Sequence, residues 1–403
     1  MSILSGKKIL LGITAGIAAY KSAFLVRLFI KAGAEVKVVI TPSAKDFVTP
    51  LTLSTLSKNT VFSSLTSEDD ENAVWNDHVA LALWADVFVI APATANTLSK
   101  MANGTCDNML LATYLSAKCP VYYAPAMDLD MYKHTSVQDA FAKLNSYGNI
   151  QIPAGFGELA SGLVGEGRMA EPEEIISFLE HDILKKLPLY NKKVLITAGP
   201  TYEAIDPVRF IGNHSSGKMG YALAQAASNL GAEVILVSGP THLDITGYSI
   251  KKIAVTTAEE MYVACHKYFD EVDIAILSAA VADFKPKSKA EQKIKKDKAA
   301  LHIELEPTKD ILASLGESKK HQLLVGFALE TENEVENAKK KLIKKNLDFI
   351  VLNSLNDKGA GFGSDTNRIT IIDKNSNQKS FDTKPKSEVA VDILNELIPY
   401  FDE

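Results

Sequence analysis

Two glycine-rich stretches of this 403-residue chain carry residue types that suit the binding of phosphate. They are GITAGIAAYK (12–21) and NHSSGKMG (213–220), and each comes shortly after an apolar run. Small residues let a ligand approach the backbone amides, while hydroxyl groups and helix N-termini satisfy phosphate oxygens. Neither spacing fits the P-loop or the dinucleotide-binding fingerprint, which disfavours a pair of nicotinamide-dependent domains. The two stretches therefore predict phosphate-binding turns of a different kind.

The first half of the chain holds two further turns of this type, TPSAKDF (41–47) and APATANTLSKMANG (91–104). Strand ends of an open parallel sheet point at one crevice, so three such turns on the same rim favour a binding site there. His78 lies just before an apolar helical stretch. A histidine in this position is either a hydrogen-bonded structural residue or a base that works near neutral pH.

The elements that must position these turns alternate between apolar strands and amphipathic helices. Residues 7–41 are typical of a strand, a helix and a second strand, and the same order begins again at KKVLITAGPT (192–201). This pattern predicts an α/β fold of two doubly wound, Rossmann-like domains. A proline, an asparagine and a change of register in PLYNKKV (188–194) place the boundary between domains 1–187 and 188–403.

Composition and charge argue against several classes of protein. The formal net charge of −6 disfavours general nucleic-acid binding, which requires a basic field. Three cysteines without C-x-x-C spacing favour neither a disulfide framework nor a zinc site, and indicate a reducing compartment. No apolar run approaches the roughly 18 residues of a membrane span, and signal-peptide flanks are missing. We therefore expect no membrane association and a cytoplasmic location. Residues 285–298 hold seven lysines and two acids, which is typical of a mobile, solvated loop.

The order of these motifs resembles that of two enzyme families that occur fused. The first half is similar to the flavin-dependent phosphopantothenoylcysteine decarboxylase family, in segments 12–21, 42–53, 78–104, 125–132 and 162–172. The second half is similar to phosphopantothenate–cysteine ligase, in segments 196–220, 278–284, 293–296, 326–331 and 345–353. The resemblance covers nearly the whole chain. It implies a flavodoxin-like flavoprotein domain followed by a ligase domain, as in the bifunctional enzyme of coenzyme A synthesis.

The resemblance implies two successive reactions. In the ligase half, CTP and Mg²⁺ turn the carboxylate of 4′-phosphopantothenate into an acyl-cytidylate with release of pyrophosphate, and the amine of L-cysteine then displaces CMP. In the first half, FMN oxidises the cysteine thiol so that a thioaldehyde accepts the electrons left by CO₂, which yields 4′-phosphopantetheine. A triphosphate, a phosphate and a carboxylate in one site require lysines and Mg²⁺, which accounts for local basicity in an acidic protein.

In the decarboxylase half, the resemblance makes His78 the active-site base. Two positions depart from the family. Asp128 stands where many relatives have asparagine, and Ser161 stands where they have a cysteine thought to donate the final proton. A hydroxyl is a far weaker acid than a thiol of pKa about 8.5, so we hypothesise that Asp128 replaces it, with its pKa raised by the substrate carboxylate. The matched flavin-binding segments contain Thr14, Gly16, Ser43, Phe47, Thr94 and Asn96.

In the ligase half, the resemblance implies that the amide of Asn213 contacts the acyl-cytidylate as a donor and that residues 215–218 line the pocket. Lys293 is expected to reach the phosphates, and Asp283 to hold CTP and the metal. Lys309 stands where relatives often carry proline, which leaves the shape of that turn open. The other residues expected around the nucleotide are Ser278, Ala279, Lys309, Asp310, Ile311, Leu312, Phe327, Lys341 and Lys345.

An alternative keeps the ligase active and makes the first half a flavin-binding assembly module that does not decarboxylate. Ser161 and Asp128 motivate it, whereas His78 and the complete GEGRMAEP segment (165–172) argue against it. The resemblance also implies a homo-oligomer, with a dodecamer-type assembly formed through the flavin domain and ligase domains paired as dimers.

Overall fold

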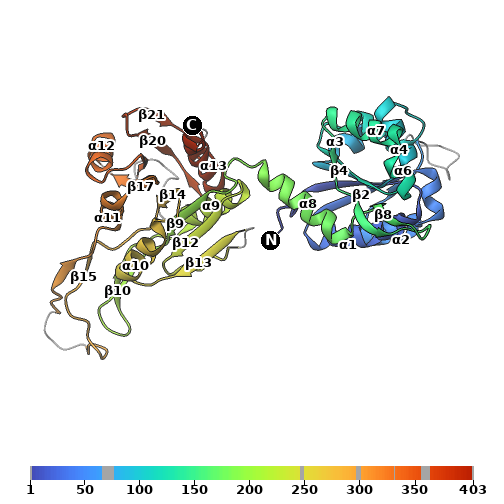
Figure 1. Ribbon diagram of the computed structural model, residues 1–403. Coiled ribbons are helices and arrows are strands. Elements are labelled where there is room, and N and C mark those ends of the chain that lie inside the picture. The colour runs from blue at the N-terminus through green and yellow to red at the C-terminus, as the bar shows by residue number, and fades with distance from the viewer. Residues whose placement is uncertain are drawn as a thin grey trace. The chain divides into compact units, whose positions relative to one another are not determined.

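The computed structural model describes residues 2–65, 77–245, 249–295, 301–330, 332–354 and 364–401 (Figure 1). The chain forms two compact units, residues 1–184 and 185–403. Each unit has a parallel sheet of its own with helices on both faces.

The N-terminal unit is built on a six-stranded parallel sheet in the order β3-β2-β1-β4-β5-β6. Without the two-residue strand β3, the order is that of flavodoxin; with it, the order is that of the Rossmann fold. The predicted α/β class is therefore confirmed, with one short strand added at the edge. The strands are β1 (Lys8–Ile13), β2 (Glu35–Ile40), β3 (Val61–Phe62), β4 (Val87–Ala93), β5 (Val121–Pro125) and β6 (Ile150–Gln151).

Neighbouring residues of each strand point to two different core layers. Leu11 of β1 packs in the layer with α1, α2 and α8, while Leu10 packs in the layer with α3, α4, α5 and α7. Because both faces are covered, the strands are almost continuously apolar. The helices are α1 (Lys21–Lys31), α2 (Pro50–Ser57), α3 (His78–Trp84), α4 (Ala95–Asn103), α5 (Met109–Ser116), α6 (Leu129–Lys133), α7 (Thr135–Ser146) and α8 (Pro172–Lys185), with 3-10 turns η1 (Ile17–Tyr20) and η2 (Pro42–Asp46).

An antiparallel hairpin, β7 (Gly155–Glu158) and β8 (Val164–Arg168), comes between the sheet and α8. The backbone amide of Met127 donates to the carbonyl of Gly167 at 3.0 Å. A Cβ on Gly165 would lie 2.4 Å from Cδ1 of Leu129, so a larger residue there would require this leucine side chain to move. The second strand of the hairpin is thus held against the segment that begins at Asp128.

The C-terminal unit has an eight-stranded sheet in the order β13-β12-β9-β14-β17-β18-β20-β21. Its first six strands are parallel and repeat the Rossmann order. Strand β20 runs antiparallel to β18, and β21 runs antiparallel to β20. The strands are β9 (Lys193–Ala198), β12 (Glu233–Ser238), β13 (Ile250–Ala254), β14 (Ile274–Leu277), β17 (Leu323–Glu330), β18 (Phe349–Ser354), β20 (Ile369–Asp373) and β21 (Gln378–Ser380).

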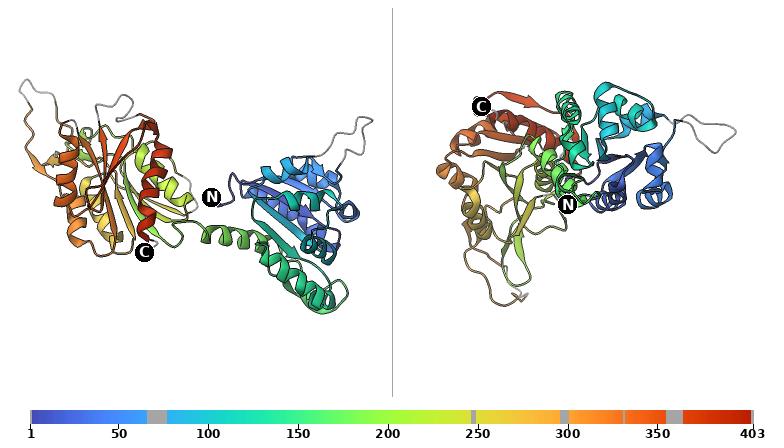
Figure 2. Two further views of the ribbon diagram at one scale, coloured as in Figure 1. Left: turned by 90° about the horizontal axis from the view of Figure 1, so that it is seen from above. Right: turned by 45° about the vertical axis from the view of Figure 1, so that its right-hand side comes forward.

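The helices of this unit also form two layers. Helices α9 and α13 pack in one core layer, and α10, α11 and α12 pack in the other, on opposite sides of the sheet (Figure 2). The helices are α9 (Lys218–Asn229), α10 (Ala258–Phe269), α11 (Ile311–Ser318), α12 (Glu334–Lys344) and α13 (Lys386–Leu397), followed by the 3-10 turn η3 (Ile398–Phe401).

Three short antiparallel pairs are attached to this sheet. They are β10 (Tyr202–Ala204) with β11 (Phe210–Gly212), β15 (Phe284–Pro286) with β16 (Leu305–Pro307), and β19 (Thr366–Asn367) with β22 (Lys384–Pro385). The β10–β11 hairpin is inserted between β9 and α9. The NHSSGKMG loop therefore follows a hairpin, and not directly the apolar strand that precedes it in the sequence.

Candidate functional site

Two of the predicted flavin residues meet in the N-terminal unit. The Oγ1 of Thr14, after β1, donates to the carbonyl of Pro92 at 2.8 Å and lies 3.3 Å from Oγ1 of Thr94. The backbone amide of Thr94 donates back to Oγ1 of Thr14 at 3.2 Å. Thr14 is fully buried. These bonds tie the turn after β1 to the turn that begins α4.

The other predicted flavin residues lie on the same set of turns. Gly16 precedes η1, and a Cβ there would lie 3.4 Å from the methyl group of Thr94. Ser43 lies in η2, after β2, and Asn96 lies in the first turn of α4; both are exposed. Phe47, at the end of η2, is 44% exposed despite its apolar ring. Strands β2, β1 and β4 are neighbours, so the three turns share one edge of the sheet.

The three predicted catalytic residues of this unit lie on three different elements. His78 is the first residue of α3, whose N-cap Asp77 accepts the amide of Ala80 at 2.9 Å. Asp128 is the N-cap of α6 and accepts the amide of Leu129 at 2.6 Å. Ser161 is exposed in the β7–β8 turn.

A nearly buried lysine fixes the base of the β7–β8 hairpin. Lys21, the first residue of α1, is 5% exposed and donates to the carbonyl of Met169 at 3.2 Å. Its Nζ also lies 2.9 Å from Oε1 of Glu171, which pairs with Arg168 at 2.8 Å. The hydrogen bond from Lys21 lowers the pKa of Glu171. The last residue of segment 12–21, Lys21, therefore holds the end of segment 162–172 in place.

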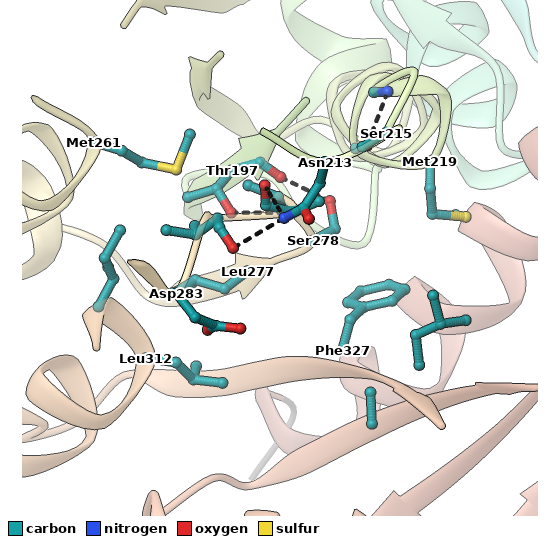
Figure 3. Close-up of a pocket in the computed structure, with 18 of the residues that line it drawn as sticks. Thr197, Asn213, Ser215, Met219, Met261, Leu277, Ser278, Asp283, Leu312 and Phe327 are labelled. Atoms are coloured by element: carbon teal, nitrogen blue, oxygen red, sulfur yellow. Dashed lines mark hydrogen bonds between the residues drawn. The ribbon is translucent and has the colours of Figure 1, made fainter. Parts of the chain in front are cut away.

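The C-terminal unit contains a cavity of about 720 Å³ at the carboxyl ends of β14 and β17 (Figure 3). Almost all residues predicted to surround the nucleotide line it. They are Asn213, Ser215, Ser216, Gly217, Lys218, Ser278, Ala279, Asp283, Lys309, Asp310, Ile311, Leu312, Phe327, Lys341 and Lys345.

Asn213 is held at one wall of this cavity by two backbone carbonyls. Its Nδ2 donates to Ala280 at 3.0 Å and to Val281 at 3.1 Å (Figure 3). Since an amide nitrogen has two hydrogens, both donors are engaged. In this arrangement Oδ1 is the atom that remains for a substrate, and the predicted donor role requires that one carbonyl be released.

The loop that carries Asn213 ends at the N-terminus of α9. Gly217 is the N-cap residue and has φ of +80°, where a Cβ would also lie 2.8 Å from Thr241. Glycine is therefore required at this position. The amide of Gly217 donates to Oγ of Ser215 at 3.3 Å, and Nζ of Lys218 pairs with Asp365 at 2.6 Å.

The cavity wall carries more positive than negative side chains, with five lysines and two carboxylates. Lys341 donates to the carbonyl of Phe327 at 2.9 Å, and Lys345 pairs with Asp310 at 2.7 Å. Lys341 lies in the last turn of α12, and Lys345 is the C-cap residue that follows this helix. Three of the five lysines are ion-paired, Lys218 with Asp365, Lys309 with Glu259 and Lys345 with Asp310, so the described wall keeps a small excess of positive charge.

The turn around Lys309 keeps a regular geometry although relatives often have proline there. Nζ of Lys309 lies 2.7 Å from Oε1 of Glu259 and 4.6 Å from the centroid of the Tyr262 ring. The hydrogen bond with Glu259 raises the pKa of Lys309. Asp310 begins α11 by accepting the amide of Ala313 at 3.0 Å. The side chain of Lys309 thus bonds to Glu259 and not to its own turn, so the backbone can form the turn without hindrance.

Lys293 is the exception among the predicted ligase residues. It is an exposed residue of the stretch that follows β15, and the described wall of the cavity does not include it. Its neighbour Ile294 is bonded to Asp206 and Arg209 near the β10–β11 hairpin.

Among the lining residues that the sequence analysis did not name individually are Asn353, Asn367 and Lys386. Asn353 is in β18, Asn367 in β19, and Lys386 begins α13. Within the described ranges, the Oδ1 atoms of both asparagines are buried and accept no hydrogen bond, although buried polar atoms are normally paired. Burial lowers the pKa of Lys386, and the charge of Lys218 lowers it further. Asn353 is the last residue of segment 345–353, which carries the resemblance, but no local pattern marks the other two.

The described residues contain no group of three or more His, Cys, Asp or Glu side chains that could hold a metal ion. Asp283 therefore belongs to no such group among the described residues. None of the described helices has the length and hydropathy that a bilayer span requires.

Two family models match the chain, one in each half. The model described as "Flavoprotein" matches residues 2–184, and that of the "DNA/pantothenate metabolism flavoprotein C-terminal domain" matches residues 189–400. The solved C-terminal domain of a coenzyme A biosynthesis bifunctional protein CoaBC is 44% identical. It covers 54% of this chain and 99% of its own, with a TM-score of 0.46.

Curated relatives match across both halves. A cysteine/cysteine sulfinic acid decarboxylase of an unknown prokaryotic organism is 56% identical over 87% of this chain and 99% of its own length. The coenzyme A biosynthesis bifunctional protein CoaBC of Bacillus subtilis is 46% identical over 98% of this chain and 97% of its own length. Similar proteins named CoaBC from several other bacteria are 42–46% identical over nearly the whole chain. The chain therefore belongs to the family of coenzyme A biosynthesis bifunctional proteins, with a flavoprotein domain in its first half and a DNA/pantothenate metabolism flavoprotein C-terminal domain in its second.

Proposed function

We propose that the chain catalyses two successive reactions of coenzyme A synthesis. The C-terminal unit couples 4′-phosphopantothenate to L-cysteine through an acyl-cytidylate, with CTP giving CMP and pyrophosphate. The N-terminal unit decarboxylates the resulting phosphopantothenoylcysteine to 4′-phosphopantetheine. Family membership over both halves supports this pair of activities over a ligase with an inactive flavin module.

The observation that carries the ligase proposal is the lysine-lined cavity around Asn213. A carboxylate becomes a good electrophile only after phosphoryl activation, and the developing negative charge must be offset where it forms. Lys341 and Lys345 approach from α12, and Lys218 approaches from α9. Three cations on two elements can hold a triphosphate while Asn213 orients the acyl group beside it.

The C-terminal cavity fits Mg²⁺ held mainly by its substrate. Mg²⁺ in nucleotide sites usually binds one or two carboxylates plus phosphate oxygens and water. Asp283 supplies one carboxylate at the cavity, and Thr308 fixes its backbone by donating to its carbonyl at 2.9 Å. We propose that Asp283 binds Mg²⁺ that is already chelated by the triphosphate.

The N-terminal unit fits FMN at the turns tied together by Thr14 and Thr94. Small and hydroxyl residues line those turns, and the exposed ring of Phe47 offers an apolar contact. When bound, FMN supplies the redox chemistry that makes the cysteine carboxylate a leaving group. The chain itself contributes His78 for deprotonation of the substrate thiol and Asp128 for the final protonation.

The test is a coupled assay with purified protein. With 4′-phosphopantothenate, L-cysteine, CTP and Mg²⁺, we expect release of pyrophosphate and formation of 4′-phosphopantetheine. Omitting CTP abolishes both products, whereas phosphopantothenoylcysteine supplied directly is still decarboxylated. A yellow protein that releases FMN on denaturation supports the flavin assignment. A protein that releases no pyrophosphate under these conditions contradicts the ligase proposal.

A second candidate concerns the substrate of the first unit. The relative that is 56% identical is named for the decarboxylation of cysteine and cysteine sulfinic acid. Free cysteine presents the same thiol and carboxylate without the phosphopantothenoyl group. CO₂ released from free L-cysteine, in the absence of CTP and at a rate that matches that from phosphopantothenoylcysteine, would favour this candidate.

We further propose a cytoplasmic homo-oligomer with paired ligase domains. The resemblance at the level of motifs is what supports this assembly. Size-exclusion chromatography with light scattering measures it directly, and a monomer in solution would contradict the proposal.

A further inference from the structure

One buried carboxylate joins the β10–β11 turn to the lysine-rich stretch after β15. Asp206 is 2% exposed. Its Oδ1 accepts the backbone amides of Val208 and Arg209, each at 2.8 Å. Its Oδ2 accepts Nε of Arg209 at 2.9 Å and the backbone amide of Ile294 at 3.1 Å. The carboxylate therefore binds its own turn and a residue 88 positions later in the chain.

Arg209 binds the other side of the same residue. Its Nη2 donates to the carbonyl of Ile294 at 2.6 Å while lying 2.6 Å from Oδ2 of Asp206. A third bond joins the same two segments, from the amide of Ala290 to the carbonyl of Ile205 at 3.0 Å. We call the pair of Asp206 and Arg209 the clamp.

The clamp holds its charges in a stable arrangement. Burial disfavours the ionised form of Asp206, but the amides of Val208, Arg209 and Ile294 outweigh burial and hold its pKa well below the ordinary value. A carboxylate that accepts several N–H donors is strongly favoured as the anion. The clamp is thus ionised at every pH at which the enzyme is expected to work.

Bonds to the backbone of Ile294 also orient Lys293. The amide hydrogen of Ile294 lies in the same plane as the Cα of Lys293, because the peptide unit between them is planar. Asp206 therefore orients this peptide plane, and Arg209 orients the next one. These bonds restrict the backbone on the C-terminal side of Lys293, while its side chain can still rotate.

The stretch has more lysines than one phosphate site can use. Residues 285–298 contain seven lysines. In the described part of this stretch, Lys287 pairs with Glu304 at 2.6 Å and Lys285 pairs with Glu306 at 3.3 Å, both across the β15–β16 arm. The clamp acts next to Lys293 and not next to these two.

We propose that Asp206 and Arg209 are positioning residues that order the backbone around Ile294 so that the neighbouring Lys293 can meet the triphosphate. This inference rests on the proposed CTP-dependent ligase. Neither clamp residue touches substrate: each acts by ordering the backbone at Ile294 before the nucleotide binds, so that less conformational freedom is lost on binding.

The first test is a double-mutant cycle on pyrophosphate release. Arg209→Ala is expected to raise KM for CTP about tenfold, the size of one lost charge-assisted hydrogen bond, with a smaller change in kcat. Lys293→Ala lowers kcat/KM directly. In the Lys293→Ala background, Arg209→Ala should change KM by less than about twofold, because its effect passes through Lys293.

The second test does not depend on catalysis. A lysine-specific protease cuts the peptide bond between Lys293 and Ile294, the bond that Asp206 holds. We expect cleavage there to be about tenfold faster in Arg209→Ala than in the wild-type protein, measured site by site by mass spectrometry. Lys287→Ala is the matched control, since it removes an ion pair of the same arm and should leave cleavage after Lys293 unchanged.

Arg209→Lys guards against a folding defect. It keeps a cation beside Asp206 but lacks the planar fork that reaches the carbonyl of Ile294 as well. It should reproduce most of the KM increase with an unchanged melting temperature.

Each outcome decides something different. Additive effects of Arg209→Ala and Lys293→Ala, or unchanged cleavage after Lys293, would overturn the clamp. If the wild-type protein releases no pyrophosphate, the assignment to CTP chemistry fails together with the proposed function, while the cleavage rates still report whether the clamp orders the backbone.

Discussion

Nζ of Lys345 lies 2.7 Å from Oδ2 and 3.0 Å from Oδ1 of Asp310, at the wall of the C-terminal cavity. Burial opposes ionisation of Asp310, but hydrogen bonds from Lys345 and from the amide of Ala313 hold its pKa below the ordinary value. The pair therefore places a cation at the proposed nucleotide site, and Asp310 balances its charge when no phosphate is bound.

We predict that Lys345→Ala raises KM for CTP about tenfold, because the substitution removes a cation and leaves the charge of Asp310 facing the triphosphate. Steady-state pyrophosphate release measures the effect, and Lys345→Arg should recover part of it. Lys340→Ala is the matched control: it lies on the same helix, in an exposed pair with Glu336 at 2.8 Å. Equal effects of the two alanine substitutions would mean that only the general charge of α12 matters.

The half-buried Lys386 leads us to expect that binding of an anionic substrate weakens as pH rises into the alkaline range. Its pKa is lowered first by burial and then by Lys218. The cation is present below this lowered pKa and is lost as pH rises through it, so KM for 4′-phosphopantothenate should rise at a pH below that of an ordinary lysine. Lys218→Gln should move this rise to higher pH. A pH profile without such a shift would show that another group titrates.

Asp128→Asn tests the final proton donor without disturbing α6, because asparagine caps helices about as well as aspartate. If Asp128 is the acid, formation of 4′-phosphopantetheine from phosphopantothenoylcysteine should fall about 10²–10⁴-fold. Ser161→Cys in the same background should restore part of the activity by supplying a thiol. A wild-type rate for Asp128→Asn alone would exclude Asp128 as the acid.

Glu171→Gln should destabilise the N-terminal unit by about 1–2 kcal/mol, because it removes the counter-ion of the buried Lys21, although solvent at the half-exposed carboxylate moderates the loss. The pKa of Glu171 is lowered in the folded state, so its contribution is present above the unfolded pKa and is lost as pH falls through the lowered value. Thermal unfolding between neutral and acidic pH measures this, and the variant should show a flatter acid slope than the wild type.

Much of this architecture could be predicted because its signals are local. Apolar runs followed by glycine-rich turns mark β1 and β9. The inserted β10–β11 hairpin gave no such signal, since its strands are three residues long. Asn367 and Lys386 reach the cavity through strands and turns that follow β18. No periodic pattern in the sequence shows that this part of the chain folds back to the cavity.

The antiparallel pair β20 and β21 has a consequence for how this protein tolerates shortening. After β18 the chain passes through β19 and this pair before α13, and Asn367 and Lys386 enter the cavity wall on the way. The C-terminal segment that carries these two residues thus forms part of the cavity wall, and we expect that it cannot be removed without loss. Deleting this segment would expose one side of the cavity in the C-terminal unit to bulk water, even if the parallel strands kept their shape.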